Sequence, residues 1–245
     1  MADDPFLDAL RADGAALAAA ARKGLDADVP PCPGWTVADL VLHTGMVHRH
    51  KSEVVRGRLA APPRPWPPPP PPREQLLGWY QDGLRELADL LAGADPATRV
   101  WSWYAPDQTV GFWRRRMAHE TAVHRVDAEL AHGKAAPIPA ALAADGVDEL
   151  LDAFLVPGLE GGPVGGRGQA VHLHGTDADG EWLLRLLPAG VEVVRGHAKG
   201  DATARGTVSD LYLFLWGRAP LERLEVFGDR ALLARVRELA VGATQ

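Results

Sequence analysis

The chain is poor in cysteine and has no long apolar run. Its 245 residues include a single cysteine, Cys32, which excludes a disulfide within the chain and is typical of proteins in a reducing cytoplasm. No segment approaches the roughly 18 consecutive apolar residues of a membrane-spanning helix. The first ten residues, MADDPFLDAL, are acidic and lack the basic segment of a signal peptide. We therefore expect a cytoplasmic protein that does not insert into membranes.

An excess of positive charge is missing as well. The formal net charge is −6, which argues against a general nucleic-acid-binding protein. Hydrophobic residues make up 47% of the chain and charged residues 24%, a balance that is ordinary for a soluble globular protein. The length suits one large domain or two modest ones, each with its own core.

Residues 111–133, GFWRRRMAHETAVHRVDAELAHG, are the most informative segment. They contain no proline, have glycine at both ends and are rich in helix formers, so we predict one helix. Because successive helical residues are rotated by about 100°, Trp113, His124 and Asp127 lie within roughly 40° of Glu120. A carboxylate and an imidazole thus occupy the middle of an apolar stripe. The opposite, predicted solvent-facing side carries Arg114, Arg125, Glu129 and His132.

A charge on a core-facing stripe is costly unless another group compensates it. Three arrangements would do so. Arg116 lies one turn before Glu120 and could form an ion pair with it. Glu120 and His124 could share a hydrogen bond. Alternatively, Glu120 and His124 could hold a metal ion together with a ligand from another helix. The His-Glu-x-x-His spacing of metallopeptidases is absent, which disfavours a peptidase.

A second predicted helix, TVADLVLHTGMVHRHKSEVV, has the same anomaly. It begins at Thr36, which forms a capping-box pattern with Asp39. His43 lies at the centre of its apolar stripe. His50 lies on the same face about 10 Å further along, and His48 is expected to point outward. A lone histidine on such a stripe is usually a satisfied core residue. Two helices with this feature leave a metal site and internal pairing as open alternatives.

Further helices are predicted at residues 4–23, 73–92 and 139–155. The proline run at 62–72 favours a stiff connector, although a ligand segment for an aromatic groove is also conceivable. Six glycines between residues 158 and 168 predict a flexible linker. We therefore expect a helical bundle at 1–157, a glycine-rich linker at 158–167 and a second domain at 168–245.

The last third of the chain has a different composition. AVHLHGTD, EWLLRLL and VEVVRG predict short strands separated by turns, and helices are predicted to start at Ser209 and Asp229. His172 and His174 share one face of the first strand. They could be metal ligands, although exposed strand positions are the simpler interpretation. The whole chain is therefore expected to be α+β, with a small mixed α/β domain at its C-terminal end.

The phrases PCPGWTVADLVLH, RRRMAHETAVHRVDAE, VHLHGTDADGEWLLRL and SDLYLFLWGR resemble the mycothiol-dependent maleylpyruvate isomerase family, especially its broad branch in mycothiol-producing bacteria. The resemblance covers nearly the whole chain. It implies an N-terminal DinB-like four-helix bundle and a C-terminal domain resembling sterol carrier protein. It also implies a divalent metal, usually zinc, held by His43, Glu120 and His124.

Two histidines and one carboxylate leave coordination positions open, as in catalytic zinc sites, and the same donors suit nickel or iron. Such a metal would lower the pKa of a bound thiol. The resemblance implies that this thiol belongs to mycothiol, so Cys32 need not be a nucleophile. Asp127 is placed to orient a metal ligand, or else to form an ion pair with Arg125 or Lys134.

The resemblance also implies an arginine of the C-terminal domain that holds substrate carboxylates. Arg218, in the sequence LWGR, is our candidate, although it could equally be a charge that interacts with the end of a helix.

We therefore expect a metal-dependent enzyme that activates a low-molecular-weight thiol for isomerisation or S-transfer on a small electrophile. Its partners would be that thiol and a small-molecule substrate, with monomer and homodimer equally open. One alternative is a non-catalytic, metal-containing protein that binds a small ligand. Another, resting on the proline run alone, is a regulator or scaffold.

Overall fold

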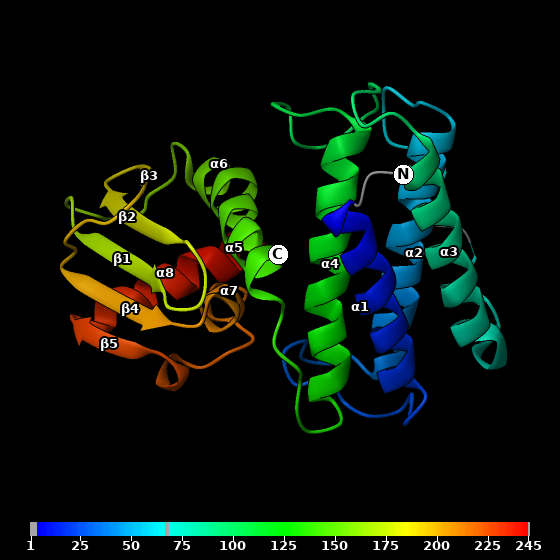
Figure 1. Cartoon of the computed structure of the whole chain (residues 1–245), viewed down its shortest axis with the longest axis horizontal. Coiled ribbons are helices and arrows are strands. Elements are labelled where there is room, and N and C mark those ends of the chain that lie inside the picture. Colours follow the sequence, from blue (N-terminus) through cyan, green and yellow to red (C-terminus); the bar gives the residue numbers. More distant parts are fainter. Residues whose placement is uncertain (1–3, 67–68, 245) are drawn as a thin grey trace. The chain divides into compact units, whose positions relative to one another are not determined.

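The computed structural model describes residues 4–66 and 69–244, so the predicted connector at 62–72 lies only partly within the described residues. The chain divides into two compact units, Met1–Ala136 and Pro137–Gln245, which are described separately (Figure 1). The first unit is helical and the second contains a five-stranded mixed sheet. The expected α+β class is confirmed. No helix among the described residues is long and apolar enough to cross a membrane.

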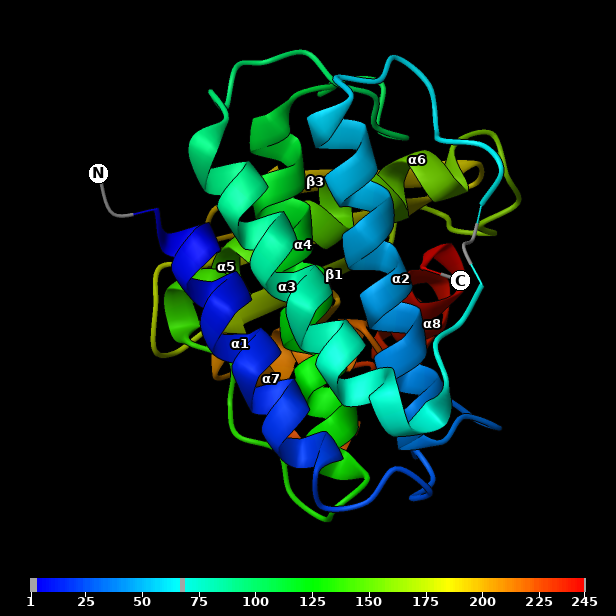
Figure 2. The ribbon, with the colours of Figure 1, turned by 90° about the vertical axis from the view of Figure 1, so that its right-hand side faces the viewer.

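Four α-helices make up the first unit within the described residues, and they lie lengthwise alongside one another (Figure 2). They are α1 (Pro5–Ala21), α2 (Val37–Arg56), α3 (Leu76–Gly93) and α4 (Val110–Leu130). Helix α1 packs mainly against α4, and α2 packs mainly against α3. The capping box at the start of α2 is present: Thr36 Oγ1 accepts from the Asp39 backbone, and the Asp39 carboxylate accepts from the Thr36 backbone.

The solvent-facing side that we predicted for α4 is wrong at Arg125. This side chain is 3% exposed, and its Nε donates to Asp13 Oδ1 of α1 at 2.9 Å. Its Nη1 donates to Glu129 Oε2 at 2.8 Å. The helical-wheel prediction assumed that α4 has one buried face. In the structure α1 covers the opposite side of α4, so the helix has a second buried face. Burying this charge requires the surrounding carboxylates.

His48 also differs from the expectation that it points outward. It is completely buried, and its Nε2 lies 3.0 Å from Thr121 Oγ1 of α4. The reason is again that the helix has neighbours on more than one side, because α2 contacts both α3 and α4. A single helical wheel cannot show this.

The second unit begins with a helical segment and continues into the sheet. The segment comprises α5 (Ala140–Glu149), a π-helical turn (Leu150–Leu155) and α6 (Val156–Leu159). The strands run in the order β3-β2-β1-β4-β5, with β1 and β4 parallel and the other neighbours antiparallel. The strands are β1 (Ala170–Gly175), β2 (Glu181–Leu187), β3 (Gly190–Arg195), β4 (Ala202–Gly206) and β5 (Glu225–Gly228).

The first three strands agree with the sequence prediction, whereas β4 and β5 had not been predicted. The sequence of β4, ATARG, has no apolar run that would indicate a strand. Helices α7 (Val208–Leu215) and α8 (Arg230–Ala243) begin close to the predicted positions. Both contact β1 and β4 and therefore cover one face of the sheet.

The structure places the boundary between the units earlier than we expected. The segment 140–159 belongs to the second unit rather than to the bundle. The glycine-rich stretch does not connect the two units but follows the sheet: Gly166 and Gly168 donate their N–H groups to the carbonyls of Leu187 and Leu186. A Cβ at Gly166 would lie 2.3 Å from the Leu186 backbone. Here glycine therefore permits a close backbone approach rather than flexibility.

The buried ion pairs of Arg125 give a testable prediction. Arg125→Ala leaves Asp13 and Glu129 without their buried cation, so the free energy of unfolding should fall by about 3–5 kcal/mol. Arg85→Ala, which removes an exposed pair with Asp82, should cost at most about 1 kcal/mol. Urea denaturation followed by circular dichroism compares the two variants. Equal losses would show that the Arg125 network does not support the bundle.

Candidate metal centre

The three residues predicted as metal ligands come together in the bundle. His43 projects from α2, and Glu120 and His124 lie one turn apart on α4. Oε1 of Glu120 lies 3.6 Å from His43 Nε2 and 3.3 Å from His124 Nε2. One ligand atom from each residue lies within 4.8 Å of the other two. The two imidazole rings meet edge to face, with centroids 5.1 Å apart.

The antiparallel arrangement of α2 and α4 produces this convergence. Residue numbers along the two helices run in opposite directions: His43 lies beside His124, His48 beside Thr121, and Lys51 beside Trp113. Groups that are far apart in the sequence therefore form one polar line between two otherwise apolar helix faces.

The two oxygens of Glu120 have different neighbours. Oε2 accepts a hydrogen bond from Arg116 Nη2 at 2.8 Å, while Oε1 faces the two imidazoles. The Arg116 side chain is 3% exposed. The ion pair that we considered as an alternative to a metal site is therefore present, and it leaves the other carboxylate oxygen directed toward the histidines.

Asp127 and Cys32 lie behind His124. Asp127 is completely buried, and its Oδ2 lies 3.0 Å from His124 Nδ1. The Cys32 Sγ contacts the same oxygen at 3.7 Å. In the neutral form of His124, an Nδ1–H group that donates a hydrogen bond to Asp127 leaves the Nε2 lone pair directed toward Glu120 and His43. This is the usual way in which a carboxylate orients a metal-binding histidine.

The charges of the site are strongly coupled. Burial opposes ionisation of Glu120, but hydrogen bonds from His124 and His43 and the charge of Arg116 outweigh it, so the pKa of Glu120 lies well below its usual range. Burial likewise disfavours the charged form of His124, but the hydrogen bonds to Asp127 and Glu120 prevail and raise its pKa to about 9. The ionised form of Glu120 is thus stabilised by Arg116 and by the positively charged form of His124.

The donor set fits a divalent transition metal. Two imidazole nitrogens and one carboxylate oxygen are common zinc ligands, and the second nitrogen of His124 already has its partner. The side chains are 39% exposed at His43, 20% at Glu120 and 12% at His124. Solvent therefore reaches the site from the His43 side.

Two neighbours of the site were not identified from the sequence. Trp35 packs against His43 with ring centroids 5.0 Å apart, in the loop that also carries Cys32. Lys51 lies two turns beyond His43 on α2, with Nζ 4.6 Å from the centre of the Trp113 ring and 3.1 Å from His50 Nδ1. Burial lowers the pKa of Lys51 to about 8, against the opposing charge of Glu120. A wheel that also scored basic side chains would have found Lys51.

Arg218, the predicted carboxylate-binding arginine, lies in the second unit just after α7. Its Nη1 donates to the Trp216 carbonyl oxygen at 2.7 Å, and its backbone N–H donates to Leu213. This is the helix-end position that we gave as the alternative interpretation. The substrate-binding role of Arg218 stays a prediction.

Two family models match the chain. The model described as Mycothiol maleylpyruvate isomerase N-terminal domain covers residues 7–129, and the MDMPI C-terminal domain covers residues 141–235. The chain belongs to the mycothiol maleylpyruvate isomerase family. The resemblance inferred from the sequence phrases is thereby confirmed. All three candidate ligands lie within the N-terminal match.

Solved structures show the same fold. The crystal structure of the mycothiol-dependent maleylpyruvate isomerase is 12% identical and covers 91% of both chains, with a TM-score of 0.62. A mutant form of that isomerase gives the same values. A ubiquinone synthesis protein, UbiJ-SCP2, is 21% identical over 44% of this chain and 96% of its own, with a TM-score of 0.29 that supports no comparison. None of the curated proteins matches the chain.

The contact between Asp127 and His124 leads to a second prediction. Asp127→Asn keeps the shape of the side chain but weakens its control of the His124 ring, so zinc affinity should fall about 10–100-fold. Asp89→Asn, on the outer side of α3, should leave the affinity unchanged. Competition with a chromophoric chelator measures both affinities. An unchanged affinity in Asp127→Asn would mean that Asp127 does not orient His124.

Proposed function

We propose that this chain is a metal-dependent enzyme that activates a low-molecular-weight thiol for isomerisation, or S-transfer, of a small electrophilic substrate. The observation that carries the proposal is the convergence of His43 and His124 on one oxygen of Glu120. Membership of the mycothiol maleylpyruvate isomerase family supports mycothiol, or a similar thiol, as the co-substrate.

His43, Glu120 and His124 would hold the divalent metal, with zinc as the first choice and nickel or iron as alternatives. When bound, the metal supplies a positive centre that lowers the pKa of a thiol at an open coordination position. Asp127 keeps His124 in the required tautomer, and Arg116 holds Glu120 in place through its second oxygen.

Two cations would act on the reactants: Arg116, which contacts Glu120, and Lys51, which lies two turns beyond His43 on α2. Arg116 is almost completely buried, and Lys51 is half-buried under Trp113. Positive charge in such surroundings favours a thiolate over a thiol and attracts substrate carboxylates. We keep Arg218 of the second unit as a further candidate for carboxylate binding.

The isomerisation needs no oxidant or reductant, because the thiolate adds to the substrate and is later released unchanged. The thiolate sulfur forms a bond to one carbon of a cis double bond that is conjugated with a carbonyl group, and the π electrons move onto the carbonyl oxygen. The former double bond can now rotate. When the electrons return, the carbon–sulfur bond breaks and the thiolate is released. The positive charges of Arg116 and Lys51 would stabilise the transient oxyanion.

Cys32 has a supporting position in this scheme. Its thiol contacts the Asp127 carboxylate, and the reacting sulfur is expected to come from the added thiol. Wild-type protein should therefore show no turnover without that thiol. Cys32→Ser keeps a donor to Asp127 and should retain turnover within a few-fold.

The proposal is tested by assaying zinc-loaded protein with mycothiol and a cis-conjugated dicarboxylate such as maleylpyruvate. His43→Ala and His124→Ala should each lower kcat/KM at least about 100-fold, because each loses stabilisation worth several kcal/mol. His132→Ala, just after the C-terminal end of α4 and outside the site, is the matched control. Metal content by elemental analysis should fall by one equivalent in the two site variants.

Two results would contradict the proposal. One is turnover that persists in His124→Ala. The other is metal-loaded wild type that binds thiols and electrophiles but converts none of them, which would instead support the non-catalytic binding protein.

A further inference from the structure

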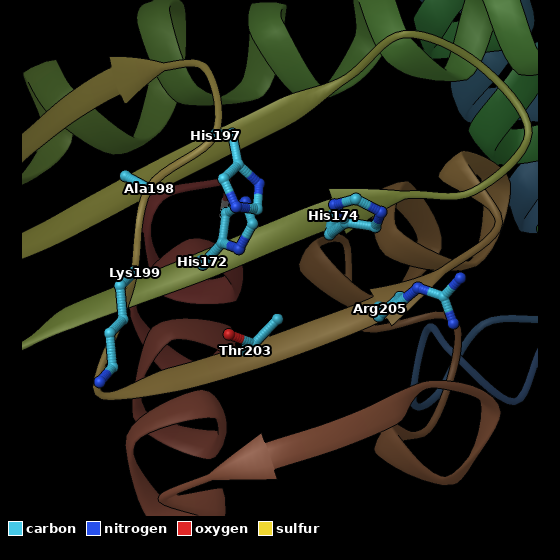
Figure 3. A pocket seen from close by; sticks show the side chains of 7 residues that line it. All are labelled: His172, His174, His197, Ala198, Lys199, Thr203 and Arg205. Carbon is cyan, nitrogen blue, oxygen red and sulfur yellow. The ribbon is translucent and has the colours of Figure 1, made fainter.

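A second group of metal-ligating side chains lies in the C-terminal unit. His172 and His174 are on β1, Glu181 is the first residue of β2, and His197 lies just after β3. In the register of the sheet, His174 is directly opposite Glu181, and His172 is two residues away on the same face. The three histidine side chains point away from the face that α7 and α8 cover (Figure 3).

The four side chains converge closely. Oε2 of Glu181 lies 2.9 Å from His172 Nε2 and 2.7 Å from His197 Nδ1, while Oε1 lies 3.2 Å from His174 Nδ1. One ligand atom from each residue lies within 4.8 Å of all the others. Donors around a tetrahedral zinc, each at about 2.0–2.1 Å, are about 3.3 Å apart. Small side-chain rotations would therefore bring the four donors to zinc-binding distances.

The chain path explains why these residues meet. Strands β3 and β4 are separated in the sheet by β2 and β1, and both run parallel to β1. Crossovers between parallel strands usually take a dozen or more residues and contain a helix. Here only residues 196–201 make the connection, and they pass over the sheet surface as an extended segment (Figure 3). His197 lies on this crossover, directly above His172 and beside Glu181.

We propose that His172, His174, Glu181 and His197 form a second site for a divalent transition metal, of the zinc class, that fastens the short crossover to the sheet. Three imidazoles and one carboxylate complete a four-coordinate shell, which is the pattern of a structural site. The bundle site, with three protein ligands, has a different pattern. The second site does not depend on the proposed function of the bundle.

The surroundings suit this role. His172 is 5% exposed beneath the crossover, whereas His197 is 79% exposed on top of it, so the four donors join a buried layer to a surface segment. The three histidines border a pocket of about 470 Å³ that Lys199 and Arg205 also line. Arg205 pairs with Glu225, which leaves Glu181 as the acidic partner of the three histidines.

A hydrogen-bond cluster without metal is the competing explanation, because the Glu181 carboxylate can accept a hydrogen bond from each imidazole. The two explanations differ in what zinc does. A metal site binds one equivalent tightly and immobilises residues 196–201, whereas a hydrogen-bond cluster binds no stoichiometric metal.

The experiment uses full-length, tag-free protein that carries His124→Ala, so that the bundle site does not contribute. After metal is removed with a chelator, excess zinc is added and the unbound zinc is removed by gel filtration; the His124→Ala protein should then retain one zinc per chain. Adding His197→Ala should reduce this to none. Because His197 is largely exposed, the double variant should fold normally. Lys199→Ala in the same background is the matched control and should retain one zinc.

Limited trypsin digestion gives a second readout. Zinc should slow cleavage after Lys199 at least several-fold in His124→Ala and have no effect when His197 is also replaced. Equal zinc contents with and without His197 would overturn the proposal. So would loss of the zinc during gel filtration, or a cleavage rate after Lys199 that is indifferent to zinc.

Discussion

Compensation of the Glu120 charge is the constraint on which the bundle site depends. This carboxylate lies on the inner side of α4, where an unpaired charge would be strongly destabilising. The structure divides the task between its two oxygens: Arg116 binds one, and His43 and His124 face the other. The division explains how a helix can keep a carboxylate among apolar neighbours and still leave one of its oxygens directed toward the two histidines.

The same principle organises what surrounds the site. Asp127 is buried completely and is placed against the outer nitrogen of His124, while Cys32 reaches the same carboxylate from the loop before α2. Lys51 and Arg116 then continue the polar line toward the other end of the helices. Each buried charge in this line has a partner from the neighbouring turn or from the other helix, so a change at one position disturbs the next. Such coupling is typical of functional sites in proteins.

The histidine clusters of the two units differ in how the fold holds them. In the bundle, imidazoles come from long helices that hold them rigidly, and three donors leave room for a ligand. In the sheet unit, the short crossover between β3 and β4 has no helix to anchor it, and a fourth donor sits on that segment. A chain with few apolar residues in the crossover, GHAKGD, has little hydrophobic surface with which to hold it down. The crossover at 196–201 is therefore held to the sheet by polar contacts, because it has neither a helix nor enough apolar side chains to pack against the strands.

The sequence by itself determined the elements whose signals are local. Spacing on one helix placed Glu120, His124 and Asp127 together, the Thr36 cap marked the start of α2, and short apolar runs between turn sequences marked β1, β2 and β3. Only the tertiary structure decided which helix faces have neighbours, and so it buried Arg125 and His48. It also paired β4 and β5, moved the segment 140–159 into the second unit, and joined His197 to His172. These outcomes depend on contacts between residues far apart in the chain, and no periodicity within one segment encodes them.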